Sequence, residues 1–108
     1  MPFTITDTLI KNIISFSNKS ERMTQLFLNN IQKHCTTLEE GIEKLDYPII
    51  QKSAHQLKGN CAIRGLDKSH SFAKEIESQA KAKENLSTIK ESYQNFLKTI
   101  IAFEEPQK

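Results

Sequence analysis

The segment from Asp46 to Gly65 reads DYPIIQKSAHQLKGNCAIRG and indicates the fold class. Its apolar residues recur every three or four positions, the spacing that places side chains on one face of an α-helix. Asp46 is a suitable N-cap, Pro48 is tolerated in a first helical turn, and Gly65 is suited to end a helix in a left-handed turn. We therefore predict a helix from Pro48 to Arg64, with a buried stripe of Ile50, Ala54, Leu57 and Cys61.

The same periodicity continues on both sides of this segment, where the chain contains few helix-breaking residues. Only 3 Gly and 3 Pro occur in 108 residues, and Gly41 lies within an apolar stripe at a cost of about 1 kcal/mol relative to alanine. We predict further helices over residues 6–16, 21–45 and 68–83, and one that Asn85 or Ser87 opens and that runs through Ile101. Asp67 is the expected cap of the helix over 68–83.

Long amphipathic helices joined by short loops pack most simply side by side with alternating direction. The expected fold is therefore all-α: an antiparallel up-and-down four-helix bundle with an additional N-terminal helix that caps one end or flanks it. The predicted buried stripes of the four remaining helices are Ile5, Leu9, Ile13 and Phe16; Phe27, Ile31, Cys35, Leu38, Ile42 and Leu45; Leu66, Phe72, Ala73, Ile76 and Ala80; and Leu86, Ile89, Tyr93, Phe96, Leu97, Ile100 and Ile101.

Length and composition limit the classes of protein to consider. A chain of 108 residues allows one domain, 1–108, whose core bundle we place at about 21–103. The 15 Lys and Arg nearly balance the 13 Asp and Glu, which argues against a nucleic-acid binder. No apolar run is long enough to cross a bilayer, and the N-terminus is no signal peptide. Cys35 and Cys61 stand alone without metal-ligand spacing, so a cytoplasmic setting and no bound metal are expected.

His55 is the first candidate for chemistry. It lies roughly 130° around the helix from the centre of the buried stripe, so its imidazole is expected to face solvent. Lys58 and Gly59 follow on the same side, three and four residues later. Imidazole is nucleophilic near neutral pH, an ammonium group offsets charge on phosphoryl oxygens, and a bare glycine permits close approach by a partner. These three residues together suit a docked phosphoryl donor.

The run His55-Gln56-Leu57-Lys58-Gly59, with Gly65 ten residues after the histidine and Ile76-Glu77 about twenty-two after it, resembles the histidine-containing phosphotransfer (HPt) domain of two-component phosphorelays. The resemblance covers residues 23–82, and Asp46 and the Phe27-Leu28 region match the usual upstream pattern. The chain departs from the family pattern at Asn60, Arg64 and Ser69.

The resemblance implies a role for each matching residue. His55 is expected to accept the phosphoryl group through Nε2, Glu77 to bind Nδ1, and Lys58 to position the phosphoryl group. The expected partner surface consists of Gln51, Lys52, Gln56, Gly59 and Ala62 around the histidine. The partners are then receiver domains of response regulators or hybrid histidine kinases, no cofactor is expected in this chain, and any Mg²⁺ belongs to the receiver's acidic pocket. A monomer is expected.

The implied function is a relay that passes a phosphoryl group between receiver aspartates through His55. No Gly-rich phosphate loop and no kinase signature occurs, so the chain is not expected to be an enzyme that uses ATP. Three alternatives stay open: a docking module that binds and inhibits a receiver or sensor kinase without carrying phosphate, a purely structural bundle, and a piece of a hybrid sensor kinase. For Glu77, the alternative is a surface ion pair with Lys74 or Lys81.

Overall fold

A computed structural model describes residues 21–101, which form four α-helices and no strand. The helices are α2 (Glu21–Glu43), α3 (Tyr47–Ile63), α4 (Asp67–Lys81) and α5 (Leu86–Ile101). The prediction of an all-α fold is confirmed over this range. The helix predicted over residues 6–16 and the end of the chain from 102 to 108 lie outside the described residues.

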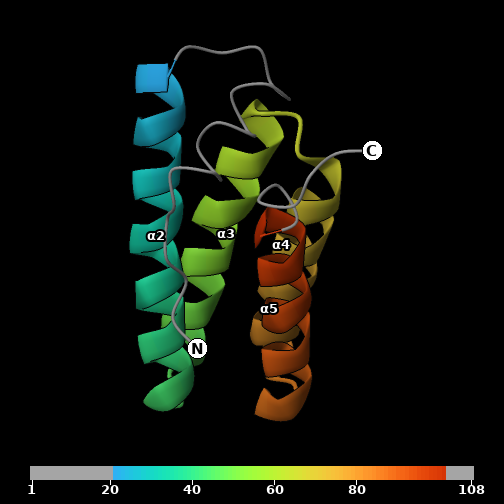
Figure 1. Ribbon diagram of the computed structural model, residues 1–108. Helices are drawn as coiled ribbons and strands as arrows, with labels where there is room; N and C mark the ends of the chain where they lie inside the picture. Colours follow the sequence, from blue (N-terminus) through green and yellow to red (C-terminus); the bar gives the residue numbers. More distant parts are fainter. Residues whose placement is uncertain (1–20, 102–108) are drawn as a thin grey trace.

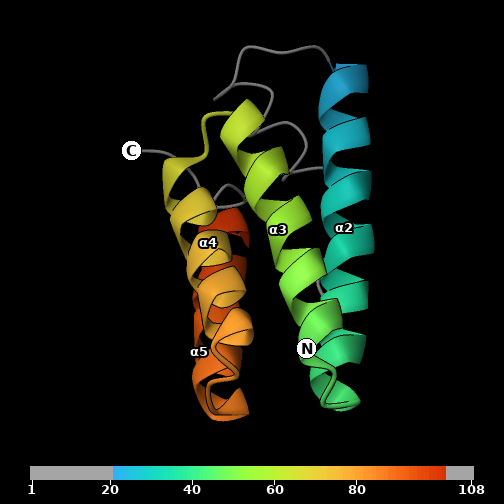
Figure 2. The ribbon, with the colours of Figure 1, turned by 180° about the vertical axis from the view of Figure 1, so that it is seen from behind.

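The four helices run alternately up and down, each beside the next (Figures 1 and 2). α3 packs against α2 on one side and against α4 on the other, and α4 packs against α5. The first and last of these helices are also linked, because the Tyr93 hydroxyl of α5 donates a hydrogen bond to Glu39 Oε2 of α2. This order places α3, which carries His55, between two neighbours and leaves one of its faces uncovered.

The core follows the apolar stripes. Nearly all the predicted stripe residues from Phe27 to Ile100 are buried, with Phe72 and Leu86 partly buried at the margin of the core. The side chain of Ile101 lies outside the described part of the chain. Leu45 is the exception, because it is 65% exposed. The helix predicted to reach Leu45 ends at Glu43, and Leu45 adopts a left-handed conformation with φ 58° in the turn that follows. The prediction that Leu45 belongs to the core was therefore wrong.

Three of the helices end in the same backbone motif. At each end, a backbone N–H donates a hydrogen bond to the carbonyl oxygen of the residue five positions earlier. The pairs are Asp46 to Gly41, Leu66 to Cys61, and Glu84 to Gln79. The residue before each donor is left-handed, and only at the end of α3 is this residue a glycine, Gly65 with φ 70°. At Leu45 and Lys83 a side chain is accepted in this conformation, at a cost of about 1 kcal/mol each.

The helix starts confirm two of the three predicted caps. The Asp46 side chain accepts a hydrogen bond from Ile49 N at 3.2 Å, and Asn85 Oδ1 accepts one from Ser87 N at 2.8 Å. Asp67 does not cap α4: Leu66 holds the cap position without a side-chain hydrogen bond, and Asp67 is the first residue of the helix. Its carboxylate still lies where the helix dipole favours negative charge.

Gly41 is buried where α2 crosses the start of α3. A Cβ atom at this position would lie 3.0 Å from Ile49 Cγ2 and from Ile50 Cγ1, and 3.2 Å from the backbone nitrogen of Ile50. The missing side chain allows the two helices to approach closely. This packing explains why a glycine stands in the middle of an otherwise regular helix.

Candidate functional site

His55 lies on the uncovered face of α3, and its side chain is 61% exposed. The antiparallel packing of α3 and α4 brings Glu77 beside it from 22 residues further along the chain. His55 Nδ1 and Glu77 Oε2 are 2.8 Å apart, within hydrogen-bonding distance. One nitrogen of the imidazole is thus held by the protein while the ring as a whole stays accessible.

Lys58 lies one helical turn after His55 and binds the same carboxylate. Its Nζ donates to Glu77 Oε1 at 2.6 Å. The Lys58 and Glu77 side chains are 26% and 20% exposed, so this pair is better shielded from water than the histidine. Glu77 therefore uses both carboxylate oxygens, one for each of two neighbours on α3.

The ionisation state of Glu77 determines which nitrogen of His55 carries the hydrogen. Burial alone would raise the pKa of Glu77, but the hydrogen bonds and positive charges of Lys58 and His55 outweigh it and hold the pKa below its usual range. Glu77 is thus a carboxylate near neutral pH and can only accept hydrogen bonds. Nδ1 must then be the donor, which leaves the lone pair of Nε2 free in the neutral ring.

The predicted site residues divide into a contacting group and an exposed group. His55, Lys58 and Glu77 come together, and in the described part of the chain Glu77 binds these two residues rather than Lys74 or Lys81 on its own helix. The residues predicted to face a partner lie on α3: Lys52, Gln56, Gly59 and Ala62 are exposed, and Gln51 is partly buried. Their role in binding stays a prediction.

Alanine substitutions at the two helical glycines are expected to change stability in opposite directions. Nothing lies within 4 Å of a Cβ atom at Gly59, so the better helix propensity of alanine should raise the free energy of unfolding of Gly59→Ala by about 1 kcal/mol. Gly41→Ala should force α2 and α3 apart and lower the free energy of unfolding by about 1–3 kcal/mol. Urea denaturation measures both values. A lower stability of Gly59→Ala, or a higher stability of Gly41→Ala, would contradict this explanation.

The packing of Arg64 could not be predicted from the sequence. Its side chain is only 8% exposed, its guanidinium carbon lies 5.1 Å from the centre of the Phe27 ring, and its Nη1 lies 3.5 Å from Thr24 Oγ1. Arginine is rarely buried to this extent. The only sequence signal was the departure from the family pattern at this position, which pointed to unusual packing without specifying it.

The two cysteines are core residues rather than reactive groups. Cys35 and Cys61 are free and buried, and burial is the main reason why the pKa of each thiol is raised to about 12. The described residues contain no cluster of three or more His, Cys, Asp or Glu side chains that suits a metal ion. Among the helices of residues 21–101, none is both long and apolar enough to span a membrane.

Comparison with known protein families shows the family to which the chain belongs. The family model of the Hpt domain matches residues 22–102, a range that contains all four described helices and the His55–Lys58–Glu77 group. Comparisons with curated proteins and with solved structures give no significant match. The chain therefore belongs to the Hpt domain family, the phosphotransfer modules of two-component signalling.

Proposed function

We propose that this chain is a relay that accepts a phosphoryl group on His55 from the phospho-aspartate of one receiver domain and passes it to an aspartate of another. The observation that supports this proposal is the shared carboxylate of Glu77, which holds Nδ1 of His55 and Nζ of Lys58 at once. The reactive nitrogen is thereby oriented towards solvent and a cation stands one turn away. Family membership supports the reaction class, since Hpt domains take part in phosphotransfer and bind receiver domains.

The proposed transfer is a direct displacement at phosphorus. The lone pair of Nε2 forms the new N–P bond, while the P–O bond of the aspartyl phosphate breaks and the aspartate leaves as a carboxylate. Positive charge develops on the imidazole as Nε2 attacks. Glu77 stabilises that charge through the Nδ1 hydrogen, as the aspartate of a catalytic triad does for its histidine.

Lys58 and the partner are proposed to neutralise the negative charge of the phosphoryl group during transfer. Transfer of a phosphoryl group proceeds through a loose transition state, so positioning and neutralisation of charge account for most of the catalysis. The Lys58 ammonium stands one helical turn from His55 and is suited to bind a phosphoryl oxygen on Nε2. Any Mg²⁺ is expected in the acidic pocket of the receiver, and the reverse of the same displacement delivers the group onward.

The face proposed to receive the partner surrounds the histidine on α3. Lys52, Gln56, Gly59 and Ala62 are exposed there, with Gln51 partly buried at its edge. Gly59 presents open space within 4 Å of where a Cβ would lie, so the backbone of α3 is bare beside His55. A receiver can approach closely at this point. Gly59→Ala should therefore slow transfer even though it stabilises the fold.

The test is phosphoryl transfer from purified receiver domains that carry labelled phosphate. The chain is incubated with each phosphorylated receiver of the same organism, and the label on the chain is followed over time. A relay gives label that is lost in acid and retained in base, as expected for phosphohistidine. Receiver binding without any label is the result that the docking module predicts. Neither label nor binding from any receiver would count against both functions.

A further inference from the structure

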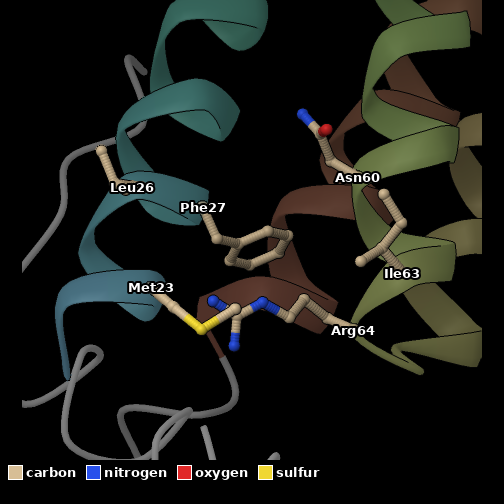
Figure 3. Close-up of a pocket in the computed structure, with 6 residues that line it drawn as sticks. All are labelled: Met23, Leu26, Phe27, Asn60, Ile63 and Arg64. Carbon is tan, nitrogen blue, oxygen red and sulfur yellow. The ribbon is translucent and has the colours of Figure 1, made fainter. Parts of the chain in front are cut away.

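The ends of α2 and α3 enclose an apolar groove that the proposed function does not use. It has a volume of about 210 Å³ and is lined by Met23, Leu26, Phe27, Asn60, Ile63 and Arg64 (Figure 3). Met23, Leu26 and Ile63 are 53%, 56% and 80% exposed. Large apolar side chains gathered in this way usually mark a surface that another segment covers.

The floor of the groove is held in a fixed arrangement. In Figure 3, Phe27 projects from α2 towards α3, and the Arg64 side chain reaches from the end of α3 towards Met23. Arg64 stacks on Phe27 at 5.1 Å, and both side chains are buried. At the rim, Asn60 Nδ2 is buried, and no residue between 21 and 101 provides it with a hydrogen-bond acceptor. The groove thus combines apolar walls with a donor that finds no acceptor among the described residues.

The sequence immediately before α2 has the matching character. Residues 1–20 lie outside the described range, so only their sequence enters the argument. Ile5, Leu9, Ile13 and Phe16 form the apolar stripe predicted for a helix over 6–16, and the four residues 17–20 connect it to Glu21. Four residues span at most about 14 Å when extended. The connection is therefore short enough for Phe16, at the end of the stripe, to reach the groove, which begins at Met23.

We propose that the groove is the docking site of the chain's own N-terminal segment, with the side chain of Phe16 seated between α2 and α3. The volume suits this occupant, because a cavity of about 150 Å³ accommodates a benzene ring. A helix that ends near residue 16 also presents unpaired carbonyl groups and the negative end of its dipole. These carbonyl groups complement the Asn60 donor. The short connection gives the segment an effective concentration in the millimolar range.

A single tryptophan tests this proposal, because the natural chain has none. In the full-length Phe16→Trp variant, the fluorescence emission should be blue-shifted and protected from iodide, independently of protein concentration. Adding Ile63→Asp should move the emission to the red and expose it to iodide. Adding Leu45→Asp should not, because Leu45 is similarly exposed, at 65%, but lies at the opposite end of α2. Phe3→Trp, upstream of the predicted helix, should be exposed throughout.

Three results would overturn the proposal. Exposed emission from Phe16→Trp in a helical, folded protein would show that the segment does not dock. Blue-shifted emission that appears only at high protein concentration would assign the groove to a second copy of the chain. Emission that shifts only when a receiver is added would assign the groove to the partner.

Thermal unfolding gives a second readout that needs no tryptophan. Phe16→Ala and Ile63→Asp should each lower the unfolding midpoint by roughly 4–8 °C, the shift typical for loss of one buried contact in a domain of this size. Because both variants remove the same contact, the double variant should lose no more than the larger single loss. Losses that add, or no loss for Ile63→Asp, would contradict docking within one chain.

Discussion

Replacing His55 with glutamine is expected to reduce phosphoryl acceptance from any receiver to background. Glutamine keeps a polar side chain of similar length on the exposed face of α3 but has no nitrogen that can form the phosphoryl bond. Because His55 is 61% exposed and outside the core, the fold should not change. The measurement is acid-labile label on the chain after incubation with a phosphorylated receiver, with circular dichroism as a check on folding.

The same variant separates a relay from a docking module. His55→Gln should still bind the receiver with an affinity close to that of the natural chain, which calorimetry can measure. His34→Gln and His70→Gln are the matched controls, and both should retain full label. Label that persists in His55→Gln and disappears in one of the controls would assign phosphorylation to another histidine.

Replacing Glu77 with alanine is expected to slow phosphoryl transfer to His55 by about 10- to 100-fold, by analogy with the loss seen when a residue that orients a metal-binding histidine is removed. The change releases Nδ1 and leaves Lys58 without the anion that holds it. Glu77→Gln should lose less, because its amide oxygen still accepts the Nδ1 hydrogen. Rapid-quench measurement of the initial transfer rate gives both values.

A matched control is available on α5, which does not carry any of the three contacting site residues. Glu91 is an exposed glutamate on α5, and Glu91→Ala should transfer at the natural rate. If Glu77→Ala also transferred at that rate, the contacts of Glu77 would be structural only. A lower rate in Glu77→Gln than in Glu77→Ala would contradict the orienting role.

The ionisation of Glu77 also predicts part of the response of the fold to acid. Its pKa is lower in the folded chain than the value of about 4.3 expected when unfolded. Ionised Glu77 therefore stabilises the fold above the unfolded pKa, and this contribution is lost as the pH falls through the lower folded value. Glu77→Gln should remove this part of the acid dependence, so its loss of stability below about pH 4 should be shallower.

The helices and most of the core could be predicted because both depend on local spacing. Apolar residues at intervals of three or four fix which face of each helix is buried, and sparse Gly and Pro leave the helices uninterrupted. The prediction that Leu45 is buried failed because the apolar stripe continues past the end of α2. Periodicity carries no information about where a left-handed turn begins. Asp67 failed as a cap because Leu66 already holds that position.

The site could be predicted only in part from physical reasoning. The solvent-facing position of His55, with Lys58 beside it, follows from the geometry of one helix. The contact between His55 and Glu77 depends on the register between α3 and α4, which no local pattern specifies. This contact was therefore expected only because of the family resemblance. Arg64 could not be predicted at all, because its burial depends on Phe27 and Thr24 from another helix.

Because His55 and Lys58 share the carboxylate of Glu77, a phosphoryl group on His55 would leave the site with an excess of negative charge. With a neutral imidazole, the charges of Glu77 and Lys58 cancel, so the resting site carries no net charge. A phosphoryl group on Nε2 would add a charge of roughly −1.5 to −2. It would also compete with Glu77 for the ammonium group of Lys58. Under the proposed function, the loaded chain would then be a high-energy donor, and we expect rapid onward transfer rather than long storage of the phosphoryl group.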